Sequence, residues 1–93
     1  MLTFEEIMSP KYLEILRLLK DKEIQASRLA EMVSFSESMF YKYLKKLIQL
    51  GLVEEVPGFN EFGRPIKLYR LTKKGYELLK KIEEIDKILS TTA

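Results

Sequence analysis

Residues 36–56 have the sequence SESMFYKYLKKLIQLGLVEEV, which combines a helix start, an amphipathic helix, a helix end and a strand. Ser36 suits the N-cap position, and Phe40, Leu44 and Leu47 recur at the spacing of one helix face. Gly51 suits the position after the last turn, because glycine adopts the left-handed conformation without a Cβ clash. The hydrophobic period then changes from 3.6 to 2 over residues 52–56. These residues therefore predict a helix over 37–50 followed directly by a strand.

The sequence upstream of this stretch predicts shorter helices. Residues 3–8 can form one or two helical turns, and Ser9-Pro10 begins a helix that ends near residues 20–22. Ile24 lies in a short extended link, and a small helix covers residues 26–32. A turn then leads to Ser36.

The sequence downstream predicts a hairpin and one long helix. Residues 66–71 alternate as a second strand, and residues 57–65 form a nine-residue loop rich in turn formers. Thr72 caps a last helix over residues 73–89. The predicted fold class is mainly α with a small β-hairpin: a three-helix core, a two-stranded hairpin and a long C-terminal helix.

Composition limits the chemistry of the chain. Its 93 residues are 46% hydrophobic and 32% charged, a balance typical of one soluble globular domain. Cys and His are both absent, which excludes thiolate and imidazole metal ligands and nucleophiles. Glu54 and Glu55 are neighbours on a strand, so their side chains point to opposite faces and cannot form an acid–base pair. We therefore expect no enzyme activity, no catalytic residue, no metal and no cofactor.

Positive charge is concentrated in the middle of the chain. Residues 36–74 hold eight Lys or Arg and four Glu, a net charge of +4, whereas residues 1–35 and 75–93 each carry −1. Phosphate binding requires such an excess on one part of a protein. The helix over 37–50 and the hairpin are therefore the candidate nucleic-acid surface.

Two blocks of sequence resemble a known family. The first is Ser27-Arg28-Leu29-Ala30-Glu31 with Ser36-Glu37-Ser38, and Leu44-Lys45-Lys46-Leu47 leading into Gly51-Leu52-Val53. The second is Gly63-Arg64-Pro65 with Tyr69-Arg70-Leu71-Thr72-Lys73-Lys74-Gly75. Together they resemble MarR-, PadR- and SlyA-like winged helix-turn-helix transcriptional regulators over residues 11–80. The small size and Lys/Glu-rich surface are also similar to short winged-helix proteins of thermophilic archaea and their viruses.

The sequence departs from this pattern in the turn between the second and third helices. The family usually has glycine there, and the matching residue is Ser34. We expect some backbone strain at Ser34.

The resemblance implies double-stranded DNA as the partner. The recognition helix, 37–50, would enter the major groove, and the wing, 57–65, would contact the minor groove or the backbone. Ser38, Met39 and Lys42 are candidates for base contacts, and Arg64 is expected to project from the wing tip. The remaining expected DNA-binding residues, mainly for phosphate contacts, are Ser36, Tyr41, Lys45, Lys46, Asn60, Lys67, Ser27 and Arg28.

The ends of the chain are expected to form a homodimer. Within a single domain, 1–93, residues 9–72 would be the DNA-binding core, and residues 1–8 and 73–89 the dimerisation elements. Apolar residues of the last helix have heptad-like spacing, and Leu79 and Ile88 widen the apolar face at its margins. The expected interface residues are Phe4, Ile7, Met8, Leu78, Ile82, Ile85 and Leu89. Such a dimer would occupy a palindromic operator with half-sites one helical turn apart.

Other functions stay open at this stage. The aromatic residues Phe40, Tyr41 and Tyr43 also suit a protein–protein interface, and the basic face also suits non-specific DNA packing. A small-molecule effector is undecided.

The sequence also predicts a cellular location. No apolar run approaches the roughly 18 residues of a membrane span, and the N-terminal residues lack the basic start of a secretion signal. We expect a cytoplasmic protein associated with the nucleoid, in the host cytoplasm if it is viral, with no membrane partner.

Overall fold

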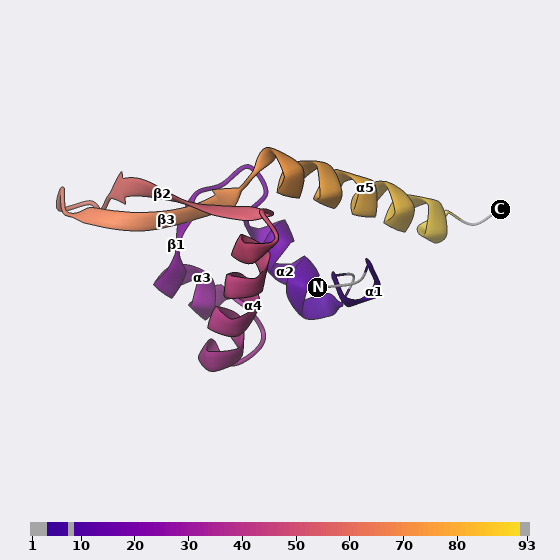
Figure 1. The fold of residues 1–93 in the computed structure, drawn as a ribbon, viewed down its shortest axis with the longest axis horizontal. Coiled ribbons are helices and arrows are strands. Elements are labelled where there is room, and N and C mark those ends of the chain that lie inside the picture. Colours follow the sequence, from indigo (N-terminus) through magenta and orange to yellow (C-terminus); the bar gives the residue numbers. More distant parts are fainter. Residues whose placement is uncertain (1–3, 8, 92–93) are drawn as a thin grey trace.

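A computed structural model describes residues 4–7 and 9–91 of the chain (Figure 1). Within them lie five helices and three strands. Their bounds are α1 Phe4–Ile7, α2 Pro10–Leu18, β1 Ile24–Gln25, α3 Ala26–Met32, α4 Glu37–Gln49, β2 Val53–Phe59, β3 Pro65–Leu71 and α5 Lys73–Ser90. The wing, β2 and β3, and the helix α5 extend from opposite ends of the helical body (Figure 1). The principal dimensions are 52 × 24 × 23 Å. The predicted class, mainly α with a β-hairpin, is confirmed.

The wing is longer than the sequence predicts, and the prediction of a nine-residue loop over 57–65 is wrong. The ladder between β2 and β3 continues from Val53, opposite Leu71, to Phe59, opposite Pro65. Pro57 is compatible with this ladder because β2 is an edge strand, where a missing N–H need not cost a ladder bond. Only residues 60–64 form the tip.

The extended link at Ile24 is a third strand of the same sheet. The strand order is β1-β3-β2, with Ile24 opposite Tyr69 and Gln25 opposite Leu68. Since β1 leads directly into α3, this pairing attaches the start of the helix-turn-helix to the base of the wing.

The hydrophobic core contains buried side chains from α2, β1, α3, α4, β2 and α5. Strand β3 contributes Tyr69 and Leu71, which are half-buried and pack against this core. Phe40 on α4 is fully buried, as the sequence predicts, and Leu44 and Leu47 line the same face. The largest fully buried side chains are Phe40, Ile15, Leu16, Leu19, Leu29, Leu47, Leu79, Ile82 and Val53. Burial of each such side chain stabilises the fold by about 1.5–3 kcal/mol.

Ser34 occupies the turn between α3 and α4 without the strain that the sequence suggests. Among the described residues, Asp21 is the only non-glycine with a positive φ. The Glu14 carboxylate of α2 instead accepts hydrogen bonds from the Ser34 backbone N–H and from its hydroxyl, both at 2.8 Å. The turn is therefore held by a side chain of α2 rather than by a glycine.

The start of α5 lies against the backbone at the end of α4. Thr72 caps α5 by accepting a hydrogen bond from the Gly75 N–H at 3.0 Å, and its own N–H donates to the Leu52 carbonyl at 3.0 Å. A Cβ atom on Gly75 would collide with that same carbonyl oxygen. Glycine is therefore required at position 75 for packing, because any side chain would push α5 away from Leu52.

This packing reverses the usual effect of alanine in a helix. Gly→Ala inside a helix normally stabilises by up to about 1 kcal/mol. We expect Gly75→Ala to destabilise the protein by about 1–3 kcal/mol, because the rigid backbone of Leu52 cannot yield. Thermal unfolding followed by circular dichroism measures the change. Glu77→Ala, at an exposed position of α5, serves as the control and should leave the midpoint nearly unchanged. A stabilised Gly75→Ala variant would contradict the packing.

Candidate nucleic-acid interface

Helix α4 presents a polar face opposite its buried stripe. Its N-cap residue, Ser36, accepts a hydrogen bond from the Met39 N–H at 3.3 Å. Ser38, Tyr41 and Lys42 are exposed, and Met39 is half-buried. The structure therefore brings the predicted base-contacting residues, Ser38, Met39 and Lys42, to the N-terminal half of one helix.

Three lysines on α4 have no acidic partner. Lys42, Lys45 and Lys46 are exposed, and within the described residues none of them forms an ion pair or a side-chain hydrogen bond. Glu37 is the only acidic residue on α4, and it lies in the first turn. The free charge of this face is therefore positive.

The wing tip holds Arg64 in a fixed position. The Asn60 Oδ1 atom accepts hydrogen bonds from the Phe62 and Arg64 N–H groups, both at 2.9 Å, and the Asn60 N–H donates to the Arg64 carbonyl at 2.9 Å. Gly63 has a φ of +77°, which glycine adopts without strain. Asn60, predicted to contact DNA directly, uses its side-chain oxygen to organise the tip, and the exposed Arg64 projects from it.

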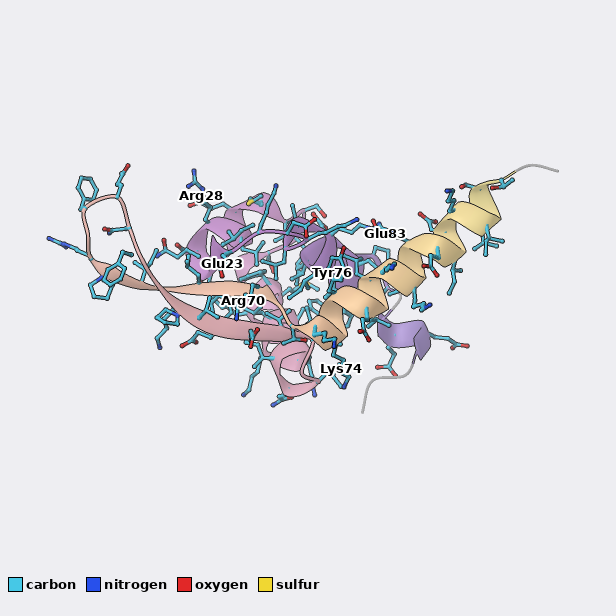
Figure 2. All side chains as sticks on the ribbon, turned by 90° about the horizontal axis from the view of Figure 1, so that it is seen from above. Glu23, Arg28, Arg70, Lys74, Tyr76 and Glu83 are labelled. Atoms are coloured by element: carbon cyan, nitrogen blue, oxygen red, sulfur yellow. The ribbon has the colours of Figure 1, made fainter. Side chains whose placement is uncertain are left out.

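The cations of the sheet are paired, unlike those of α4. Lys67 lies 3.8 Å from the Glu55 carboxylate, and Arg70 binds both Glu54 at 3.0 Å and Glu23 at 3.1 Å. The hydrogen bond to Glu54 and, to a smaller extent, the one to Glu23 raise the pKa of Arg70 above its ordinary value. Figure 2 shows Arg70 of the sheet beside Glu23, which directly precedes β1.

Two other side chains near the base of the wing, Tyr69 and Lys74, also form hydrogen bonds. Burial raises the pKa of Tyr69, and a hydrogen bond from its hydroxyl to Glu55 raises this pKa by a smaller amount. Lys74 donates to the Leu50 carbonyl at 2.9 Å and so caps the end of α4. The net charge of +4 over residues 36–74 thus overstates the positive charge that the wing leaves unpaired. Among the described residues of the wing, Arg64 is the only cation without an acidic partner.

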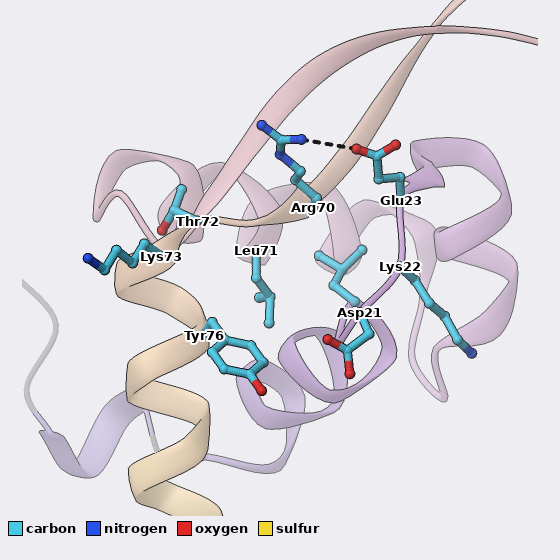
Figure 3. Close-up of a pocket in the computed structure, with 9 residues that line it drawn as sticks. Asp21, Lys22, Glu23, Arg70, Leu71, Thr72, Lys73 and Tyr76 are labelled. Atoms are coloured by element: carbon cyan, nitrogen blue, oxygen red, sulfur yellow. Dashed lines mark hydrogen bonds and ion pairs between the residues drawn. The ribbon is translucent and has the colours of Figure 1, made fainter.

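Two grooves border the sheet. The first, of about 610 Å³, lies between the turn after α2 and the start of α5, with Asp21, Arg70 and Tyr76 in its lining (Figure 3). The second, of about 640 Å³, separates α3 from the wing and includes Arg28, Met32 and Phe59. Ser27 and Arg28, predicted as phosphate ligands, are both exposed on α3, and Arg28 also faces this groove.

The aromatic residues of α4 do not form an exposed cluster. Phe40 is fully buried, and Tyr43 makes edge-on contacts with Tyr12 and Phe35, at ring-centre distances of 4.6 and 5.7 Å. Tyr41 is exposed and contacts Phe40. The structure therefore removes the feature that suggested a protein–protein interface on this helix.

The predicted dimer residues separate into two groups. Ile82 is 1% exposed within the single chain and Leu78 packs against the core, so neither forms an open face. Ile85 and Leu89 are exposed, together with Ile88, which the heptad prediction placed only at its margin. The side chains of Phe4 and Ile7, and residue Met8, lie outside the described part of the chain.

The sequence does not single out two residues that this geometry brings forward. Glu14 fixes the turn before α4, and Phe62 is exposed at the wing tip. The Asn60-x-x-Gly63 pattern is typical of a tight turn and could have indicated Phe62 as its apex. In residues 4–7 and 9–91, no cluster of acidic side chains suits a metal ion, and no helix has the length and hydropathy of a membrane span.

Comparison with known proteins agrees with this geometry. A PadR-like transcriptional regulator from Bacillus cereus is 22% identical with a TM-score of 0.68, and the match covers 86% of this chain and 93% of that one. AF1382 from Archaeoglobus fulgidus is 22% identical with a TM-score of 0.72, covering 95% and 97%. A MarR family transcriptional regulator from Silicibacter pomeroyi is 20% identical with a TM-score of 0.77, covering 91% and 56%. No curated protein matches significantly.

At these identities the solved structures show a shared fold, which is that of PadR-like and MarR family regulators. The family model described as winged helix-turn-helix matches residues 6–90, which is nearly the whole chain. The described elements agree with it, since α3, the turn at Ser34 and α4 precede a β-hairpin wing. This chain therefore belongs to the winged helix-turn-helix family.

Proposed function

We propose that this protein binds double-stranded DNA as a homodimeric transcriptional regulator, with no enzymatic role. The observation that carries the proposal is the unpaired positive face of α4, formed by Lys42, Lys45 and Lys46. These lysines lie on the helix that the fold presents for recognition, whereas the cations of the sheet are paired with Glu54, Glu55 and Glu23. An exposed helix face with free lysines suits phosphate.

Specificity would come from the N-terminal half of α4. Lys42 can donate to guanine O6 or N7, and Met39 can contact a thymine methyl group. Ser38 adds a hydroxyl that donates and accepts. Lys45 and Lys46, with Ser36, Tyr41 and Arg28, would hold phosphates and fix the register, and Arg64 would reach a narrow minor groove.

The dimer would use the exposed end of α5. Ile85, Ile88 and Leu89 are 37%, 71% and 77% exposed. They follow the part of α5 in which Leu79 and Ile82 are buried in the core. Figure 1 shows this end of α5 projecting away from the helical body. A second copy would remove these side chains from water, which favours association. Residues 9–72 would then be the DNA-binding core.

Selection from a randomised duplex library tests the proposal as a whole. The purified protein is expected to enrich an inverted repeat with half-sites about 10 base pairs apart, since two recognition helices related by two-fold symmetry face successive major grooves. Retention without a motif would replace specific regulation by non-specific packing. No retention at any salt concentration would contradict DNA binding.

The charge of α4 predicts a specific loss of affinity. Lys45→Ala with Lys46→Ala should weaken binding to the selected duplex by at least about tenfold, because two phosphate contacts are lost from each chain. The salt dependence of log K should become shallower by about 1 for each lysine removed. Fluorescence anisotropy at several salt concentrations measures both quantities.

A matched variant controls for total charge. Lys80→Ala with Lys87→Ala removes the same two charges from exposed positions of α5, one heptad apart and away from the apolar side. This variant should bind DNA nearly as the wild type does. Equal losses in the two variants would show that net charge, rather than the α4 face, governs binding.

The exposed position of Arg64 predicts a second loss of affinity for DNA. Arg64→Ala should weaken duplex binding several-fold, because a guanidinium group is attracted by the negative potential of a narrow minor groove. Its side chain forms no ion pair within the described residues, so the protein should remain equally stable. Lys67→Ala, on the neighbouring strand but paired with Glu55, should have a smaller effect. Unchanged affinity of Arg64→Ala would remove the wing tip from the interface.

The end of α5 predicts the oligomeric state. Ile85→Glu with Leu89→Glu should give a folded monomer in sedimentation velocity, because two charges per chain would be buried in the apolar contact. Ile82 is left unchanged in this variant, since the chain's own core buries it. Lys80→Glu with Lys87→Glu is the control and should remain dimeric. A dimer that persists in the Ile85/Leu89 variant would contradict this interface.

A further inference from the structure

The wing tip carries an exposed aromatic side chain that neither the core nor the hairpin explains. Four large apolar side chains are more than 70% exposed in the described part of the chain: Phe59 at 71%, Phe62 at 80%, Ile88 at 71% and Leu89 at 77%. They lie at the two ends of the molecule, on the wing and on α5 (Figure 1). The proposed second copy would cover Ile88 and Leu89. Phe62 needs another partner.

The backbone under Phe62 is rigid. The Phe62 N–H donates to Asn60 Oδ1 at 2.9 Å, and the Gly63 N–H donates to the Asn60 carbonyl at 3.0 Å. Together with the two bonds between Asn60 and Arg64, these contacts close the five-residue tip at the end of a continuous ladder. The backbone of such a tip loses little conformational freedom when its side chain binds a partner.

The charged residues of the tip are arranged around Phe62. Phe62 and Arg64 line the same hollow, with Asn60 as the third residue. Glu61 lines instead the groove that contains Arg28, on the α3 side of the wing. The aromatic ring is therefore accompanied by a cation, and this combination suits a polyanion with an apolar interior better than it suits a neutral protein surface.

The size of the tip also favours DNA. The minor groove is about 6 Å wide, too narrow for a two-stranded ribbon but accessible to single side chains from its apex. Apolar side chains inserted from this groove partly unstack a base step and kink the duplex. The long wing carries its apex well away from the body, so the tip can reach a groove beside the recognition helix (Figure 1).

We propose that Phe62 is a wedge that inserts between two base pairs from the minor groove, while Arg64 beside it binds the groove or its phosphates. The inference rests on the proposed DNA binding and adds a second source of specificity. Insertion costs least at flexible pyrimidine–purine steps such as TA and CA, and most at stiff A-tracts. The protein would therefore select deformable steps where the wing touches the duplex.

The test measures DNA distortion separately from binding. The duplex carries the selected site on about 30 base pairs, roughly three helical turns, with a dye pair at its ends and 2-aminopurine at the step facing the wing. Anisotropy establishes saturation, energy transfer reports bending, and 2-aminopurine fluorescence reports unstacking. The wild type is expected to bend the duplex by about 20–90° and to raise 2-aminopurine fluorescence several-fold.

Variants at two phenylalanines identify the wedge. Phe62→Ala should lose both distortion signals and bind about fivefold or more weakly, with an unchanged salt slope because no charge is removed. Phe62→Leu should retain most of the distortion, because leucine can also act as a wedge. Phe59→Ala removes another largely exposed ring, 71% exposed, below the tip and should behave as the wild type does. Since Phe62 is exposed, none of its variants should change the unfolding midpoint.

Four outcomes would overturn the inference. If the saturated wild type leaves 2-aminopurine fluorescence unchanged, or if Phe62→Ala distorts the duplex as the wild type does, DNA binding survives and the wedge does not. If Phe62→Ala instead changes the sedimentation of the free protein, Phe62 contacts a second copy rather than DNA. If the wild type gives no anisotropy change at all, the proposed function itself fails, and the wedge fails with it.

Discussion

The close approach of Gly75 to the Leu52 carbonyl is the contact on which the arrangement of the molecule depends. Around it, Thr72 binds the backbone of Gly51 and Leu52, and Lys74 caps the end of α4. Helix α4, the base of the wing and α5 therefore meet at one point. Because this junction is made largely of backbone atoms, it transmits position rigidly between the elements proposed to face DNA and the helix that would bring two copies together.

Pairing of charges, rather than their number, distinguishes the candidate DNA-binding surface from the rest of the sheet. The wing contains Lys67 and Arg70, yet Glu54, Glu55 and Glu23 neutralise both. Within the described residues, the free cations of the elements proposed to face DNA are those of α4 and Arg64 at the tip, with Arg28 on α3 beside them. Such an arrangement limits non-specific attraction along the sheet and directs the positive field to the recognition helix and the apex of the wing.

The sequence predicts what depends on local pattern. The stripe of Phe40, Leu44 and Leu47, with its cap at Ser36 and its end at Gly51, specifies α4 closely, and Thr72 specifies the start of α5. The length of the wing could not be predicted, because Pro57 and Gly58 are turn formers locally, and only the cross-strand register keeps them in the ladder. The burial of Ile82 and the pairing of Arg70 likewise arise from tertiary contacts between distant residues.

Free cations on α4 and the wing tip are proposed to bind duplex DNA. The most direct measurement is the affinity of the wild-type protein for its selected duplex as a function of salt concentration. With about four phosphate contacts from each of two chains, log K should fall linearly with log salt with a slope of about −7. A slope near zero would contradict the account, because binding would then be independent of the phosphates that the unpaired lysines are proposed to hold.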